Sequence, residues 1–464
     1  MPKTTTPLTK KQILSLTALS FALYFIVNDT TIFPVAIPSI EISFNSDITT
    51  TQWLINGYAL IFGVLIISCG RIADIFGRRK LFFIGSAIFA TFSLICALLS
   101  DISSLLVSRA LMGVGAAIMW PSILGMIFNV VPRDQSGIAG GLIMTICGVS
   151  YAIGPILGGG ISDLLGWRWT FLLNPIEAVV ACLLCWKFVG VDLVKDVKER
   201  IDYAGVITLS ISLLCLLLAL DRAVDTGFRS PLIITLMTIF LVFLGLFIIV
   251  EWRAKENALI PNDIARNNRF FAACLASLMI SVAFYVPIFY IPQYFSKVHG
   301  YSAILAGMGL LPILIFSSFA SYISGFLYQK LKPKMIVSVG AACIFLGMFM
   351  LARLHEEMTI LDMIFELILL GIGFGAFYST ITTIAITIVD PSRSSLAAGI
   401  FYMSQTVGGA LGLGINTTIV AMSPDLSSGI ARAFTMNAYL ALTGFVVCLL
   451  FVNARAVKAE RKVI

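Results

Sequence analysis

The chain has 464 residues and a formal net charge of +7, and 59% of its residues are apolar whereas only 12% are charged. A water-soluble domain carries about 25% charged residues, so this composition and a mean hydropathy of +0.99 exclude a soluble enzyme or binding module. At roughly 30 residues for each helix and its loop, the length accommodates about fourteen membrane-spanning helices. We therefore expect an all-α polytopic membrane protein.

Fourteen apolar runs follow one another along the chain. They lie at 12–38, 52–69, 81–99, 104–128, 138–162, 170–190, 204–220, 231–250, 270–295, 303–327, 335–352, 359–389, 395–421 and 433–453. The first run is too long for a cleaved signal peptide, so we expect it to remain as the first span. All 9 cysteines lie within runs, where buried thiols are expected rather than disulfides or a metal site.

The basic residues are distributed unevenly between the two sides of the predicted membrane. Most of the 31 Lys and Arg residues lie at the termini and in every second loop. The opposite loops hold only Arg168, Arg222, Arg229, Lys297, Arg353 and Arg432. Because basic loops stay on the cytoplasmic side, this alternation predicts cytoplasmic termini and an even number of spans. It also explains the net charge, so no nucleic-acid partner is expected.

The two halves of the chain share a pattern of glycine and arginine positions at a nearly constant offset. Gly70 recurs as Gly325, Gly113 and Gly115 as Gly371 and Gly373, and Arg133, Gly148 and Gly154 as Arg393, Gly408 and Gly414. Such internal repetition predicts a duplicated six-span bundle. We expect one bundle in residues 1–190, the other in 270–464, and an inserted segment with two further spans at 191–269.

The stretch GRIADIFGRRK, residues 70–80, lies between the second and third runs. Gly70 and Gly77 are expected to give the backbone freedom that a short turn requires. The single acid, Asp74, can pair with the neighbouring bases or with a helix N-terminus. Those bases, which favour the cytoplasmic side, are Arg71, Arg78, Arg79 and Lys80.

This stretch resembles the loop between the second and third spans of the major facilitator superfamily. Further stretches resemble the fourteen-span drug:proton antiporter branch of that superfamily, and together they cover essentially the whole chain. They are NDTTIFPVAIP at 28–38, Trp53 and Tyr58, SRALMGVGAA at 108–117, GVSYAIGPILGG at 148–159, GWRWTFLLNP at 166–175 and YIPQYFSKVHGYSAILAGMGLLP at 290–312. Two residues depart from the family pattern: Pro34 stands where Asn is usual, and Met112 where Gln is usual.

The resemblance implies roles for three sets of residues. The cytoplasmic gate would comprise Gly70, Asp74, Gly77, Arg78 and Arg79, and the substrate path would include Tyr58, Tyr290, Gln293 and Gln405. The antiporter motif of the fifth span would comprise Gly148, Gly154, Pro155, Gly158 and Gly159. Glycines at one-turn spacings allow close helix contacts and proline kinks a helix, so this motif would form a kinked seam between the bundles. A generic tight helix contact is the alternative.

Four charged side chains are expected inside the bilayer: Asp29, Arg109, Glu177 and Glu366. Each costs at least ~2.5 kcal/mol at a helix centre, which favours a functional pairing or a water-filled cavity. Asp29 is the candidate proton carrier, with a helix-end acid near the outer surface as the alternative. Arg109, which stays charged, would favour the ionised form of a nearby acid or would clamp carbonyl groups. Glu177 and Glu366 are expected to snorkel near the outer ends of their spans, where they could attract a cationic substrate.

These features predict a transporter of the inner or plasma membrane that exports small amphipathic or hydrophobic compounds, as in multidrug efflux, in exchange for protons. It would need no cofactor, and its partners would be the substrate, protons and the bilayer, with a periplasmic adaptor left open. An exporter or symporter of a specific metabolite, such as a siderophore or fatty acid, is the alternative. A non-transporting scaffold or receptor is the alternative of another class. An enzyme is not expected, because His299 and His355 lie in outer loops and no catalytic motif is present.

Overall fold

The computed structural model describes residues 7–46, 48–190, 202–227, 229–254, 258–301 and 303–451. Residues 191–201, which open the predicted inserted segment, lie outside this part of the chain. The helices are α1 (Lys10–Phe44), α2 (Ile48–Phe76), α3 (Arg78–Leu98), α4 (Ile102–Val130), α5 (Ser136–Leu165), α6 (Arg168–Phe188), α7 (Tyr203–Thr226), α8 (Pro231–Ala254), α9 (Asn262–Ala265), α10 (Asn268–Lys297), α11 (Ala303–Met308), α12 (Leu311–Lys330), α13 (Pro333–Leu351), α14 (Ile364–Thr387), α15 (Ser394–Ala421) and α16 (Leu426–Phe451). Two short 3₁₀ helices, Arg133–Gln135 and Pro391–Arg393, precede α5 and α15.

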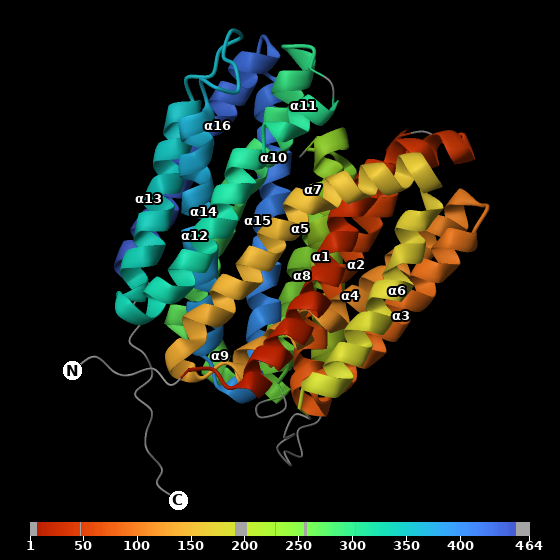
Figure 1. The fold of residues 1–464 in the computed structure, drawn as a ribbon, viewed down its shortest axis with the longest axis vertical. Coiled ribbons are helices and arrows are strands. Elements are labelled where there is room, and N and C mark those ends of the chain that lie inside the picture. Colours follow the sequence, from red (N-terminus) through yellow and green to blue (C-terminus); the bar gives the residue numbers. More distant parts are fainter. Residues whose placement is uncertain are drawn as a thin grey trace, which may run out of the picture.

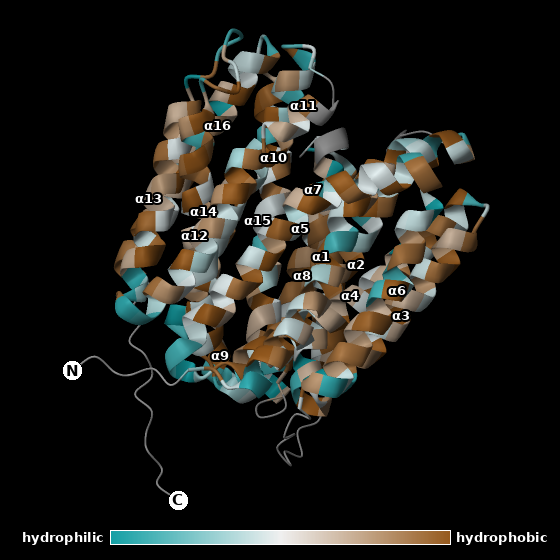
Figure 2. Ribbon diagram, in the orientation of Figure 1, coloured by the Kyte–Doolittle hydropathy of each residue, from teal (hydrophilic) through white to brown (hydrophobic). Residues whose placement is uncertain are grey.

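Within the described ranges, 14 helices are long and apolar enough to cross a membrane. Figure 2 shows hydrophobic residues along the middle of the helices and hydrophilic residues gathered at the two ends of the molecule. This is the distribution that a bilayer requires, because a helix satisfies its backbone groups internally and presents apolar side chains to lipid. The all-α, fourteen-span prediction is therefore confirmed.

The long helices form two groups. Helices α1–α6 pack on one another, and so do α10–α16. Figure 1 shows these groups spread apart at the upper end of the view and close together at the lower end, near α9. The inserted helices α7 and α8 pack on each other, and α7 also contacts α2 of the first group and α15 of the second. We call the lower end, where the groups meet, the closed end.

Helix α2 continues through most of the stretch that was predicted to be a turn. It ends at Phe76, and only Gly77 separates it from α3. Gly77 has φ +100°, a conformation that favours glycine. Gly70 lies inside the helix, where a Cβ atom would stand 2.6 Å from the Ser395 carbonyl oxygen of α15. The prediction that Gly70 supplies turn flexibility is wrong, because its role here is to admit a neighbouring helix.

Glycines bring the two groups together at the closed end. A Cβ on Gly399 of α15 would lie 2.7 Å from the Ile66 carbonyl oxygen of α2, and one on Gly325 of α12 would lie 2.8 Å from the Gly137 carbonyl oxygen of α5. A Cβ on Gly140 would overlap the Thr383 side chain of α14. Such approaches leave no room for a side chain, so the closed end depends on these positions.

Candidate functional site

A buried ion pair lies inside the first group of helices. Arg109 Nη1 of α4 lies 3.0 Å from Oδ1 and 2.8 Å from Oδ2 of Asp29 in α1. The two side chains are only 2% and 3% exposed. Removing either partner would leave an uncompensated charge in a low-dielectric interior, which is strongly destabilising. The structure thus brings together the two residues predicted to couple protons.

Polar and aromatic side chains hold this pair in place. Asn174 of α6 donates a hydrogen bond of 2.8 Å to Asp29 Oδ1 and another of 3.0 Å to Ser93 Oγ of α3. The guanidinium carbon of Arg109 lies 4.2 Å from the ring centroid of Phe33 and 4.4 Å from that of Tyr58. Because aromatic faces attract cations, Arg109 is held between rings and a carboxylate, in its charged form.

Glu177 is buried rather than near the surface. Its residue is 8% exposed, and its Oε1 accepts a hydrogen bond of 3.1 Å from Asn28 Nδ2 of α1. The expectation that Glu177 snorkels to the outer surface is therefore wrong, because α6 turns this face toward α1. Glu366 lies half-buried in the first turn of α14, close to where it was predicted.

A cavity of about 200 Å³ lies between the two groups of helices. Its walls are mostly aromatic and aliphatic, with Arg109 as the one charged side chain among them. The lining residues are Ile26, Val27, Thr30, Phe33, Pro34, Ile55, Tyr58, Ala59, Phe62, Arg109, Trp120, Tyr151, Tyr285, Tyr402 and Thr406. Concave, largely apolar sites with a few polar groups are typical of small-molecule binding. The ion pair thus borders the cavity through Arg109.

Three aromatic rings join the two groups at the edge of this cavity. The rings of Trp120 and Tyr402 have centroids 4.5 Å apart, and Phe62 lies 5.9 Å from Tyr402 and 6.2 Å from Trp120. Trp120 and Phe62 come from the first group, whereas Tyr402 comes from the second. Edge-to-face and tilted contacts of this kind stabilise aromatic clusters. This aromatic contact connects the two groups at the wall of the cavity.

The predicted substrate-path residues are only partly in this cavity. Tyr58 lines it, and Gln405 lies on α15 between two lining residues without lining the cavity itself. Tyr290 donates to Thr417 Oγ1 at 3.2 Å within the second group. Gln293 accepts from Lys297 at an exposed position. Sequence reasoning missed Trp120, Tyr151, Tyr285 and Tyr402, because nothing in an apolar run marks which aromatic residue faces a neighbouring bundle.

The two departures from the family pattern lie in different surroundings. Pro34 lines the cavity, so the wall has no amide group there. Met112 is fully buried, and its sulfur lies 3.6 Å from Arg109 Nη1 and 3.9 Å from the thiol of Cys96. A change of substrate recognition is therefore expected from Pro34 rather than from Met112.

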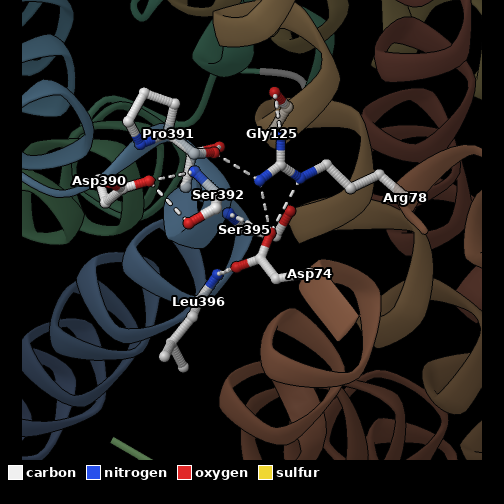
Figure 3. A network of polar contacts seen from close by, with 9 residues as sticks. Asp74, Arg78, Gly125, Asp390, Pro391, Ser392, Ser395 and Leu396 are labelled. Atoms are coloured by element: carbon white, nitrogen blue, oxygen red, sulfur yellow. Dashed lines mark hydrogen bonds and ion pairs between the residues drawn. The ribbon is translucent and has the colours of Figure 1, made fainter. Parts of the chain in front are cut away.

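Asp74 links the two groups at the closed end (Figure 3). Its carboxylate accepts hydrogen bonds of 2.8 and 2.7 Å from Nε and Nη2 of Arg78. It also accepts from the backbone N–H groups of Ser395, at 3.2 Å, and Leu396, at 2.8 Å, in the first turn of α15. A carboxylate at a helix N-terminus satisfies free N–H groups and the helix dipole. Asp74 thus uses both of the partners that the sequence offered.

Arg78 extends this network toward the other group, and Arg79 contacts α6. Arg78 Nη2 donates to the Pro391 carbonyl oxygen at 2.7 Å, which adds a second contact to the other group. Arg79 Nη2 instead donates to the Trp186 carbonyl oxygen of α6 at 2.8 Å. The resemblance implies that Arg79 belongs to the gate, and this contact with α6 of its own group leaves that role a prediction.

The glycines of the predicted antiporter motif have two different neighbours. A Cβ on Gly148 would overlap Ser318 of α12, in the other group. In contrast, Gly154 faces Thr31, and a Cβ on Gly158 would lie 2.6 Å from the Ile32 carbonyl oxygen, both in α1 of the same group. A Cβ on Gly159 would meet only Val35, at 3.7 Å, and Pro155 is exposed. Within this motif only Gly148 contributes to a seam between the groups.

Comparison with known proteins identifies the family. The family model described as Major Facilitator Superfamily matches residues 18–413. The human organic anion transporter MFSD10 (TETRAN) has the same fold, with a TM-score of 0.67 over 94% of this chain and 99% of its own at 12% identity.

Two curated relatives are similar over most of the chain. The puromycin resistance protein pur8 of Streptomyces alboniger is 28% identical over 85% of this chain and 79% of its own length. The multidrug export protein EmrB of Haemophilus influenzae is 26% identical over 86% of this chain and 79% of its own length. With the fold, the central cavity and the family match in agreement, the chain belongs to the major facilitator superfamily and is a membrane transporter rather than an enzyme.

Proposed function

We propose that the protein is a proton-coupled antiporter that exports small amphipathic or hydrophobic compounds by alternating access, as in multidrug efflux. The observation behind this proposal is that Arg109 lines the cavity and is paired with Asp29. One side chain therefore connects the protonatable acid with the space in which a substrate would bind. The relatives named for puromycin resistance and multidrug export favour this substrate class.

The coupling follows from the charge of the pair. When Asp29 is ionised, it neutralises Arg109, and the aromatic cavity suits an apolar compound. When a proton binds Asp29, Arg109 loses its counter-ion and an unbalanced positive charge borders the cavity. Because burying an unpaired charge is costly, this state disfavours an apolar or cationic substrate and favours water. Proton binding and substrate binding thus exclude each other, as antiport requires.

The closed end faces the cytoplasm in this proposal. The basic loops that predict cytoplasmic termini include GRIADIFGRRK, and Asp74 of this stretch joins the two groups at the closed end. The conformation is then outward-facing, in the inner or plasma membrane. Two bundles, residues 1–190 and 270–464, would rock about the cavity, driven by the proton gradient without a cofactor.

Transport in everted vesicles tests the proposal. A deletion strain and an overexpressing strain are first screened against a panel of toxic compounds, and vesicles then measure proton-driven uptake of the compound identified. Asp29→Asn keeps the shape of the side chain but removes the titrating group. It should abolish proton-driven uptake. Because Arg109 then lacks its counter-ion at every pH, counterflow exchange should be as slow as in the wild type at low pH and should no longer change with pH. Glu366→Gln should at most change which cationic compounds are accepted.

Three outcomes would contradict the proposal. Normal proton release on substrate addition by the Asp29 variant, together with its loss in the Glu366 variant, would reverse the assignment. Accumulation of the substrate against its gradient by whole cells under an inward proton gradient would support a symporter of a specific metabolite. Neutralising both Asp29 and Arg109 without any transport phenotype would support a scaffold or receptor.

A further inference from the structure

Asn28 and Glu177 form a buried polar pair that the proposed coupling does not use. They lie on facing helices, α1 and α6, beside the ion pair of Asp29. Asn28 directly precedes Asp29, and Glu177 lies one helical turn after Asn174, which binds Asp29. Neither Asn28 nor Glu177 lines the central cavity. A role in contacting substrate therefore does not explain a carboxyl group at this depth.

The hydrogen bonds of the pair are incomplete for an ionised carboxylate. Asn28 Nδ2 donates to Glu177 Oε1 at 3.1 Å. The remaining oxygens, Asn28 Oδ1 and Glu177 Oε2, are both buried and have no hydrogen-bond partner among the described residues. Both are acceptors when Glu177 is ionised, and a buried acceptor without a donor is costly. A proton on Oε2 would turn one of the two acceptors into a donor.

The charges around Glu177 also favour its neutral form. The titratable groups that face it are Asp29 and Tyr24, both on α1. From α3 and α5, which also pack on α6, the described residues place no charged side chain against it. The nearby cation, Arg109, is bound to Asp29. An ionised Glu177 would therefore lack a cation and would be repelled by Asp29.

We propose that Glu177 is a second proton-binding site, with its proton on Oε2 and the Asn28 carboxamide as its hydrogen-bond partner. The two acids between helix α1 and helix α6 then have different charges: Asp29 is ionised and Glu177 is neutral. Environments that separate two neighbouring acids in this way are typical of sites that handle protons. On release, the O–H bond of Glu177 breaks, the proton passes to water, and the side chain becomes a carboxylate. Its use as a second coupled proton rests on the proposed function.

Infrared spectroscopy of the purified full chain tests the protonation without any substrate. At neutral pH the wild type should show the carbonyl band of a protonated carboxylic acid, which shifts in D₂O. Glu177→Gln should remove this band, whereas Asp163→Asn, at an exposed acid, should leave it unchanged. Glutamine can donate to Asn28 Oδ1 and accept from Nδ2, so the variant should fold with undiminished thermal stability. Identical carboxylic acid bands in the wild type and in Glu177→Gln would overturn the proposal.

A second variant keeps the test valid if Glu177→Gln does not fold. Asn28→Leu removes the carboxamide but leaves the acid, so the band should remain and move to the frequency of a carboxyl group without that hydrogen bond. An unshifted band in Asn28→Leu would contradict the assignment of Asn28 as the partner.

The coupling role needs a separate measurement. We use everted vesicles in which valinomycin and potassium hold the membrane potential at zero. If two protons are exchanged for each ethidium, the ratio of ethidium concentrations inside and outside at equilibrium should rise about 100-fold for each pH unit of gradient. In Glu177→Gln it should rise about 10-fold, as for one proton. An unchanged dependence in the variant would overturn the coupling role of Glu177. If the wild type accumulates no ethidium, the proposed function fails in this assay, while the infrared band still decides whether Glu177 is protonated.

Discussion

Asp74→Asn should weaken the closed end of the molecule without unfolding it. The carboxylate accepts two hydrogen bonds from Arg78 and two from the backbone of α15, and its side chain is 2% exposed. Asparagine has the same shape but one acceptor oxygen and no charge. It can keep one of the two bonds to α15, so the change removes at least one charge-assisted bond between the groups, worth ~1.5–3 kcal/mol. This energy corresponds to a shift of roughly 10- to 100-fold toward the state that is open at this end.

The accessibility of a cysteine at position 403 would measure this shift. Met403 is buried, and its sulfur would lie 3.9 Å from a Cβ on Gly63 of α2, across the boundary between the groups. In everted vesicles, a membrane-impermeant maleimide should label Met403→Cys faster when Asp74→Asn is also present. Lys80→Gln removes a charge from the same stretch at an exposed position and serves as the matched control. Equal labelling with and without Asp74→Asn, or an equal increase with Lys80→Gln, would refute the reasoning.

Three further predictions follow from individual contacts. The side chain of Gly140→Val would overlap Thr383, so this variant should prevent closure, raise labelling of a cysteine at position 403 and abolish transport. A Cβ on Gly160 would meet nothing within 4 Å, so Gly160→Val should behave as wild type. Asn174→Leu removes the hydrogen-bond donors to Asp29 and Ser93 and should destabilise the purified protein by about 1–3 kcal/mol. A fall in melting temperature no larger than that of Gln293→Leu would argue against this destabilisation. Trp120→Ala removes the ring 4.5 Å from Tyr402 and should increase passive dye leakage in vesicles, and a leak equal to wild type would show that other contacts seal the closed end.

The spans and the acid–base pair could be predicted because they depend on local sequence. A run of about 20 apolar residues specifies a membrane helix by itself, and this holds for all 14 spanning helices in the described ranges. A charge within such a run is costly enough to require a partner. The sequence therefore marks Asp29 and Arg109 as candidates for pairing, and the structure places them 2.8 Å apart.

The partners of the other polar residues could not be predicted in the same way. Asn28 and Glu177 are 149 positions apart in the chain, and the rotation of α6 decides whether that acid reaches solvent or faces α1. The apolar sequence of a helix does not determine its rotation, because lipid and the protein interior accept the same apolar side chains. The role of Gly70 is hidden for a related reason: in the sequence, a glycine that admits a neighbouring helix looks the same as a glycine that permits a turn.

The sequence by itself determined that this protein is an all-α transporter with fourteen spans, charged residues at Asp29 and Arg109, and a basic stretch around Asp74. Only the tertiary structure decided that Asp74 caps α15 of the other group, that Arg109 borders an aromatic cavity, and that Glu177 is paired with Asn28. The physical reason is that insertion in a bilayer depends on the hydrophobicity of each segment. Which helix faces meet depends instead on close packing and on hydrogen bonds between residues far apart in the chain.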